Sequence, residues 1–267
     1  MTRSRPGGWT GFAAAALACG AGLGCATGTG TASAPPGLPQ NATVIEAENF
    51  KTSFTTFRIQ GYRIQNLKRG KKAPEASAVA LAGYRLALGF DWLRPPSGFA
   101  YQVVKDGASA PPTDVACLWG RARTTNGFAT KAYGSGFHVP EGSVLVCEVR
   151  LAPGAEPWKL LVWTGPPANA VSAGFPGGGL LSSGDVRYEA ISTNLLDPGA
   201  KPTPSLTATS FVREGTAVAA VDRTAPGRIL LGPSIQLFDQ PLFAAVGTAI
   251  LLGDWEGTLG EWAGSPP

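Results

Sequence analysis

The chain contains a single histidine, His138, and that count limits the chemistry available to it. Zinc sites built on two or three imidazoles are excluded, and a Ser-His-Asp triad would have to use His138. No G-x-S-x-G element is present to hold a nucleophilic serine on a sharp turn. His138 lies in GSGFHVPEG, a loop entering an expected strand, where an exposed or half-buried histidine is the simpler interpretation. We therefore predict neither a catalytic residue nor a metal site.

Two pairs of carboxylates have a spacing that would let them act together. Glu46 with Glu48, and Asp254 with Glu256, stand two residues apart, which places both groups of a pair on one face of a strand. Two carboxylates flanking a glycosidic bond carry out most glycoside hydrolysis. That role requires a concave, aromatic-lined site, and solvated surface acids are the alternative interpretation.

Two tryptophans near the end of the sequence are candidates for ligand stacking. Trp255 and Trp262 lie in the polar, glycine-containing segment DWEGTLGEW. An exposed indole beside acidic groups can stack on a sugar ring or anchor a partner protein. The alternative is that the segment folds back and both indoles cap the core.

The glycine-rich stretches and the charge exclude two further classes of function. Gly177–Gly179 is followed by neither a lysine nor a helical pattern, so a phosphate loop is not expected, and we predict no cofactor. The formal net charge of +4 falls to +2 (20 basic against 18 acidic residues) without Arg3 and Arg5. Such a modest balance does not predict a nucleic-acid partner.

The first 25 residues have the three zones of an export signal. Arg3 and Arg5 form a short positive region, and the apolar stretch Gly11–Ala18 is too short to span a bilayer. Small residues follow, with Cys19 and Cys25 among them. A cysteine directly after small and apolar residues is what a lipoprotein signal requires, because its thiol is acylated before cleavage.

In these residues the sequence resembles bacterial lipoprotein precursors, and the resemblance covers residues 1–25 only. Ala21-Gly22-Leu23-Gly24-Cys25 matches the lipobox loosely, because Gly22 stands where leucine is usual, and Ala16-Leu17-Ala18-Cys19 is the rival. We favour Cys25 as the acylated residue, with Cys19 as the alternative. An ordinary secretory signal with two incidental cysteines is the other interpretation. The resemblance also implies the outer membrane, since Ala26 replaces the aspartate that signals retention at the inner membrane.

A flexible linker and one mainly β domain are expected after the signal. Residues 26–41 are small, polar and rich in Pro and Gly, so they bury too little apolar surface to become ordered. Residues 42–267 suffice for one large all-β domain or two small ones, with a sub-boundary near 195–204. Cys117 and Cys147 each lie in a strand-like run, and an even pair in an exported chain predicts a disulfide between neighbouring strands or facing sheets. Two buried free thiols are the alternative.

Alternation with a period of two predicts most of the body to be β-strand. Phe99, Tyr101 and Val103 point one way, and Val115, Cys117 and Trp119 form the next such run. The segment 158–163 is apolar on both faces, which places it centrally, and 165–184 reads as a long connection. A phase slip at Gly61 predicts a β-bulge. At least ten short strands favour an all-β, antiparallel β-sandwich or jelly-roll-like body.

One short helix is expected near the C-terminus. Asp239 is placed to cap it and Pro241 to lie in its first turn, while Gly253 would close it. Within 242–252 an apolar stripe faces one way. An edge strand is the alternative interpretation.

Together these patterns predict an exported, lipid-anchored protein of the cell envelope that acts as a non-catalytic binding or structural module. Its expected partners are a membrane, through the N-terminal lipid, and an unidentified envelope protein or glycan. A carbohydrate-active envelope hydrolase using paired carboxylates, and a subunit of an envelope assembly, are the alternatives.

Overall fold

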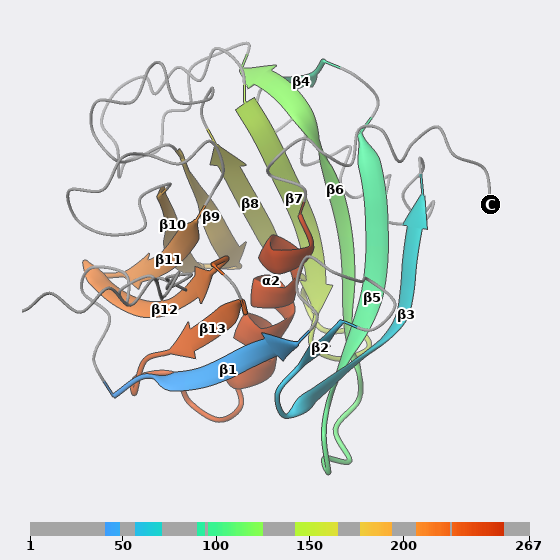
Figure 1. Cartoon of the computed structure of the whole chain (residues 1–267), viewed down its shortest axis with the longest axis vertical. Coiled ribbons are helices and arrows are strands. Elements are labelled where there is room, and N and C mark those ends of the chain that lie inside the picture. The colour runs from blue at the N-terminus through green and yellow to red at the C-terminus, as the bar shows by residue number, and fades with distance from the viewer. Residues whose placement is uncertain are drawn as a thin grey trace, which may run out of the picture.

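The computed structural model (Figure 1) describes residues 41–48, 57–70, 90–93, 96–124, 142–164, 177–193, 207–224 and 226–253. In these residues, one antiparallel sheet of thirteen strands surrounds the helix α2 (Gln240–Leu252). The strands are β1 (Thr43–Glu48), β2 (Arg58–Ile59), β3 (Tyr62–Gly70), β4 (Phe90–Trp92), β5 (Ser97–Lys105), β6 (Thr113–Thr124), β7 (Gly142–Arg150), β8 (Trp158–Thr164), β9 (Gly177–Ser183), β10 (Val186–Thr193), β11 (Ala208–Arg213), β12 (Thr216–Asp222) and β13 (Arg228–Leu231).

The sheet closes on itself as a barrel. From β6, successive neighbours are β5, β3, β2, β1, β13, β12, β11, β10, β9, β8 and β7, and β7 pairs with β6 again. These twelve strands form the ring, whereas β4 extends the wall beside β6 beyond the end of β5. Closure satisfies the backbone groups that an open sheet would leave along its two edges.

The expected sandwich or jelly roll is wrong, although the all-β antiparallel body and the short helix are confirmed. Period-two alternation shows only that each strand buries one of its faces. In a sandwich that face packs on a second sheet, and in a barrel it packs on whatever fills the ring. Here the filling is α2, whose residues Leu242–Leu252 are all buried.

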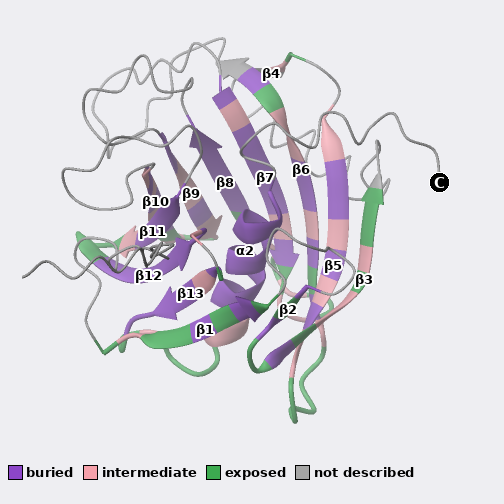
Figure 2. Cartoon of the chain, viewed as in Figure 1, coloured by how far each residue is buried: buried purple, intermediate pink, exposed green. Residues whose placement is uncertain are grey.

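The helix α2 lies inside the barrel (Figure 1), with its residues drawn almost entirely as buried in Figure 2. It contacts β5, β6 and β7 on one wall and β12 and β13 on the opposite wall. Phe243 packs edge-on against Tyr188 of β10 and Phe211 of β11, at ring-centroid distances of 5.4 and 5.7 Å. Gly247 allows close approach to β13, because a Cβ there would lie 2.5 Å from Cδ1 of Ile229.

The helix itself was predicted correctly, but its surroundings and its ends were not. The expected apolar stripe is wrong because α2 is buried all round, and a helix that is apolar on every side belongs in a core. Pro241 does lie in the first turn, whereas the Asp239 side chain makes no cap hydrogen bond. Gly253 follows the last helical residue in an extended conformation, with its N–H donating to the carbonyl of Ala249.

Two other local expectations change. Gly61 lies not in a bulge but in the turn between β2 and β3, at φ 76°, where glycine is favoured. The bulge of this region falls later, between Gln65 and Lys68, and Asn66 adopts φ 55° there. By contrast, β8 is confirmed as a strand buried on both faces, between β7 and β9.

Candidate functional site

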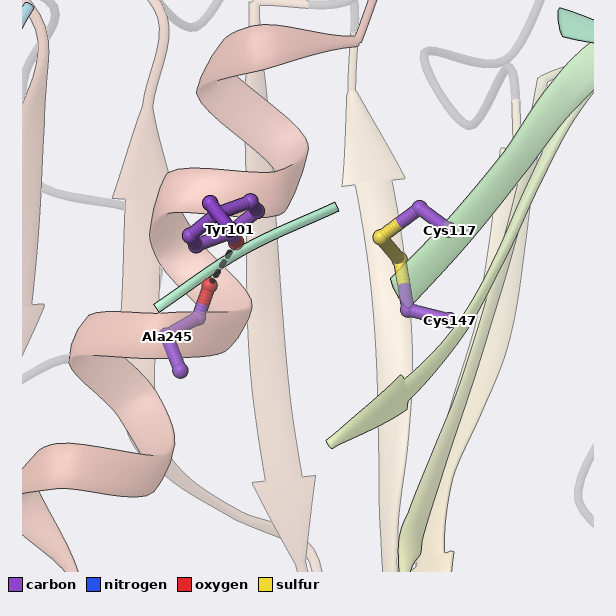
Figure 3. Close-up of a disulfide and its surroundings, with 4 residues drawn as sticks. All are labelled: Tyr101, Cys117, Cys147 and Ala245. Carbon is purple, nitrogen blue, oxygen red and sulfur yellow. Dashed lines mark hydrogen bonds between the residues drawn. A yellow bond between two sulfur atoms is a disulfide. The ribbon is translucent and has the colours of Figure 1, made fainter. Parts of the chain in front are cut away.

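A disulfide joins two neighbouring strands of the barrel (Figure 3). Cys117 on β6 stands directly opposite Cys147 on β7, with their Cα atoms 4.1 Å apart and their sulfur atoms 2.06 Å apart. Both side chains are buried and belong to the same core as α2. The predicted cysteine pair is therefore confirmed as able to form a disulfide, and it connects neighbouring strands rather than facing sheets.

A buried tyrosine connects the wall of the barrel to the helix. The hydroxyl of Tyr101, on β5, donates a hydrogen bond of 2.7 Å to the carbonyl oxygen of Ala245 on α2 (Figure 3). Burial raises the pKa of the Tyr101 hydroxyl well above 10.0. Tyr101 is therefore a neutral hydrogen-bond donor at physiological pH and is engaged with the helix.

Two arginines from different parts of the barrel wall bind the carbonyl groups at the C-terminal end of α2. Arg69 on β3 donates to the carbonyl of Leu252, and Arg223, directly after β12, donates to that of Gly253, both at 3.2 Å. The end of α2 carries no basic residue of its own. Cations from the wall thus complement the partial negative charge at the helix C-terminus. This role was not predicted from the sequence, because no local pattern links either arginine to α2.

Asp222, at the end of β12, is the most deeply buried carboxylate of the described residues, at 1% exposure. Its Oδ1 accepts hydrogen bonds from the backbone N–H and the hydroxyl of Thr224, at 2.8 and 2.5 Å. Its Oδ2 accepts two from the guanidinium of Arg228. With both oxygens engaged, Asp222 holds the turn between β12 and β13 rather than offering a base to a substrate.

The carboxylates Glu46 and Glu48 lie on the outer face of β1, and both are exposed. Glu46 stands opposite Arg228 of β13, and Glu48 stands opposite Arg58 of β2. Each acid thus has a basic residue as its neighbour across the sheet. Their exposure on the outer face matches solvated surface acids, which is the alternative interpretation that the spacing left open.

The remaining candidates lie outside the described residues, so the structure neither supports nor removes them. They are Cys19, Cys25, His138, Asp254, Trp255, Glu256 and Trp262. Within the described ranges, no group of three or more His, Cys, Asp or Glu side chains is arranged to hold a metal ion. The same ranges contain no helix with the length and apolar character needed to cross a membrane.

The glycine stretch 177–179 begins a strand, which sequence analysis placed inside a long connection. Gly177 and Gly179 lie on β9 directly against the backbone of β8, where a Cβ would collide with the carbonyl groups of Trp163 and Leu161. The glycines are thus required by close strand packing. Their lack of side chains removes the alternation by which strands are recognised.

An exposed apolar pair was also missed. Leu237 and Phe238 lie between β13 and α2 and are 74% and 70% exposed, the highest values among the exposed large hydrophobic side chains of the described residues. The sequence contains the signal, two large apolar residues between polar neighbours just before a helix cap. Sequence alone does not show that both side chains are exposed, so no role was predicted for them.

No protein-family model, no curated protein and no solved structure matches this chain. Its function is therefore inferred from the residues and geometry described above. In that geometry the buried polar groups Tyr101, Asp222 and Arg223 bind other parts of the protein, and the interior of the barrel is occupied by α2.

Proposed function

We propose that this chain is an exported, lipid-anchored protein of the cell envelope that acts as a non-catalytic binding or structural module. The observation that carries the proposal is the filled interior. The ring of strands encloses a helix whose residues 242–252 are buried on every side, and Tyr101 and Arg223 fasten that helix to the wall. A partner would then meet the outer surface or the ends of the barrel.

Two features support a location outside the cytoplasm. The N-terminal segment 1–25 resembles a lipoprotein signal, with Cys25 as the favoured acylation site and Cys19 as the alternative. Independently, Cys117 and Cys147 stand as a bonded pair, and disulfides persist in oxidising compartments. Ala26 favours the outer membrane, and residues 26–41 would serve as the tether.

The module role is supported by how the described polar groups are used. Asp222 accepts hydrogen bonds on both oxygens, and the exposed Glu46 and Glu48 each stand opposite an arginine. Asp222 is therefore not free to act as a base, and Glu46 and Glu48 lie on the exposed outer face of β1, whereas hydrolysis of a glycan needs two carboxyl groups facing each other across the substrate. An envelope protein or a glycan bound at the outer surface is therefore the proposed partner.

Mass spectrometry of the full-length protein, expressed in a bacterium and extracted from its membranes, tests the anchor. The N-terminal peptide of the mature chain should begin with an acylated Cys25. The Cys25→Ala variant should carry no lipid, while Cys19→Ala should be acylated as the wild type is. An unacylated N-terminus in the wild type would refute the anchor, and acylation at Cys19 would move the site.

A further inference from the structure

The exposed pair Leu237–Phe238 is held in place by the structure around it. Gly232 donates its N–H to the carbonyl of Val218, which extends the barrel wall by one residue beyond β13. The N–H of Ile235 bonds the carbonyl of Gly232, and the Ile235 side chain packs against the core. The N–H of Asp239 then bonds the carbonyl of Gln236. One hydrogen-bonded turn, Gly232–Ile235, thus precedes the pair, and a second, Gln236–Asp239, contains Leu237 and Phe238 and holds them on the outside.

This pair lies at the end of the barrel where the proposed tether joins it. Thr43, the first residue of β1, pairs with Leu231, the last residue of β13, so the chain that precedes β1 and the loop that follows β13 leave from the same end. In Figure 1 that loop runs below β1, and Figure 2 shows much of it exposed. Val44, 41% exposed, adds a third apolar side chain at this end.

The size of the pair favours a lipid bilayer over a protein as the occupant. Two side chains of this size present on the order of 300 Å² of apolar surface, well below the roughly 800 Å² per partner of a stable protein interface. A bilayer surface takes up even small apolar tips, because insertion needs no complementary shape.

The tether length brings this end of the barrel within reach of the membrane. As the proposed linker, the 16 residues 26–41 would have a root-mean-square length of roughly 20–24 Å. A tether of that length keeps the local concentration of the loop at the bilayer high, so even weak insertion becomes populated.

Leu237 and Phe238 are exposed, they lie at the end of the barrel where β1 begins, and the proposed tether keeps that end near the bilayer. We therefore infer that both side chains insert into the surface of the membrane that carries the lipid anchor. The barrel then docks by this end, with the opposite end directed away from the bilayer. This inference rests on the proposed lipid anchor for its geometry. Insertion itself depends only on the two side chains, so the two ideas can fail separately.

A fluorescent probe beside the pair tests the inference in the full-length, acylated protein. An environment-sensitive dye is attached at Gln236→Cys, which leaves Leu237 and Phe238 intact, and the protein is reconstituted into phosphatidylethanolamine–phosphatidylglycerol vesicles containing spin-labelled lipid. The dye should shift to the blue and be quenched by the spin label. Adding Leu237→Ser and Phe238→Ser should abolish both effects while acylation persists.

Leu93→Cys supplies the matched control. Leu93 is another exposed apolar residue, 40% exposed, and it follows β4 beside the far end of β6. A dye at this position should remain in water. Equal quenching at positions 93 and 236 would contradict docking by one end. Shielding of the dye at position 236 without vesicles would assign the pair to a protein contact and overturn the inference.

The anchor and the insertion are separated with the full chain carrying Cys25→Ala. Its binding constant for the same vesicles should fall by about tenfold or more when Leu237→Ser and Phe238→Ser are added. An acylated wild type whose dye stays in water refutes insertion and leaves the anchor standing. An unacylated wild type whose vesicle binding still depends on the pair refutes the anchor and supports insertion.

Discussion

At the scale of single residues, the side chains that sequence analysis would inspect for chemistry serve mainly to hold the barrel and its helix together. Cys117 and Cys147 bridge two strands, Tyr101 and Arg223 bind α2, and Asp222 holds a turn. The pairing of the cysteines was predictable, because each lies in a strand-like run and their number is even. The roles of Tyr101 and Arg223 were not, because their partners are backbone carbonyl groups in a distant part of the chain, which no residue type marks in the sequence.

The disulfide should contribute strongly to stability. Replacing Cys117 and Cys147 together by alanine should lower the free energy of unfolding by about 3–4 kcal/mol, because the bridge closes a loop across 30 residues of the unfolded chain. Urea unfolding with and without reductant measures the effect, with the double variant as the control that reductant should not affect. Two alkylatable thiols in the unfolded, unreduced body would contradict the bridge.

Two buried tyrosines should respond differently to loss of the hydroxyl. Tyr101→Phe removes the hydrogen bond to Ala245 and should cost about 1 kcal/mol. Tyr62→Phe should be neutral or stabilising, because the Tyr62 hydroxyl is buried with no hydrogen-bond partner among the described residues. Urea unfolding of both variants tests the contrast. Equal losses would mean that the Tyr101 hydrogen bond contributes nothing of its own.

Tyr101 should also make the free energy of unfolding depend on pH in the alkaline range. Burial raises the pKa of Tyr101 in the folded protein above 10.0, so the unfolded chain releases this proton first. The contribution of Tyr101 to the free energy of unfolding is therefore complete below pH 10, and it is lost as pH rises toward the pKa of Tyr101 in the folded protein. The free energy of unfolding should fall less steeply above pH 10 in Tyr101→Phe than in the wild type.

At the scale of elements, α2 shows what a local pattern predicts and where it stops. Pro241 and the apolar run after it indicate a helix, and the helix is present. The same run gives no information about which elements surround α2, since that depends on pairing between strands far apart in the sequence. For β9 even the element was missed, because Gly177 and Gly179 are selected by close strand contact and carry no alternation.

The contact between α2 and β13 should be sensitive to size. Gly247→Val should destabilise the protein by about 1–3 kcal/mol, because the new side chain collides with Ile229. Adding Ile229→Ala should recover part of that loss, and a double-mutant cycle from thermal or urea unfolding measures the coupling. If Gly247→Val does not change the free energy of unfolding, or if the losses from the two single substitutions add up in the double variant, then α2 does not press against β13 at this point.

At the scale of the whole molecule, the sequence contained the all-β character but not the closure of the sheet. The strands that alternate each indicate one buried face, and that pattern is shared by a sandwich and a barrel. Closure depends on β6 pairing with both β5 and β7, and on a helix of suitable width to fill the ring. Both are properties of distant contacts, which a single sequence read locally does not show.

The filled barrel directs any partner to the outside of the protein, and this depends on the enclosure of α2. Hydrogen–deuterium exchange followed by mass spectrometry measures it most directly. If α2 is enclosed on all sides, the amides of residues 244–252 should exchange only through global unfolding, as slowly as those of β6 and β7. Exchange in α2 that is orders of magnitude faster than in those strands would mean that the helix leaves the ring, and would contradict the account.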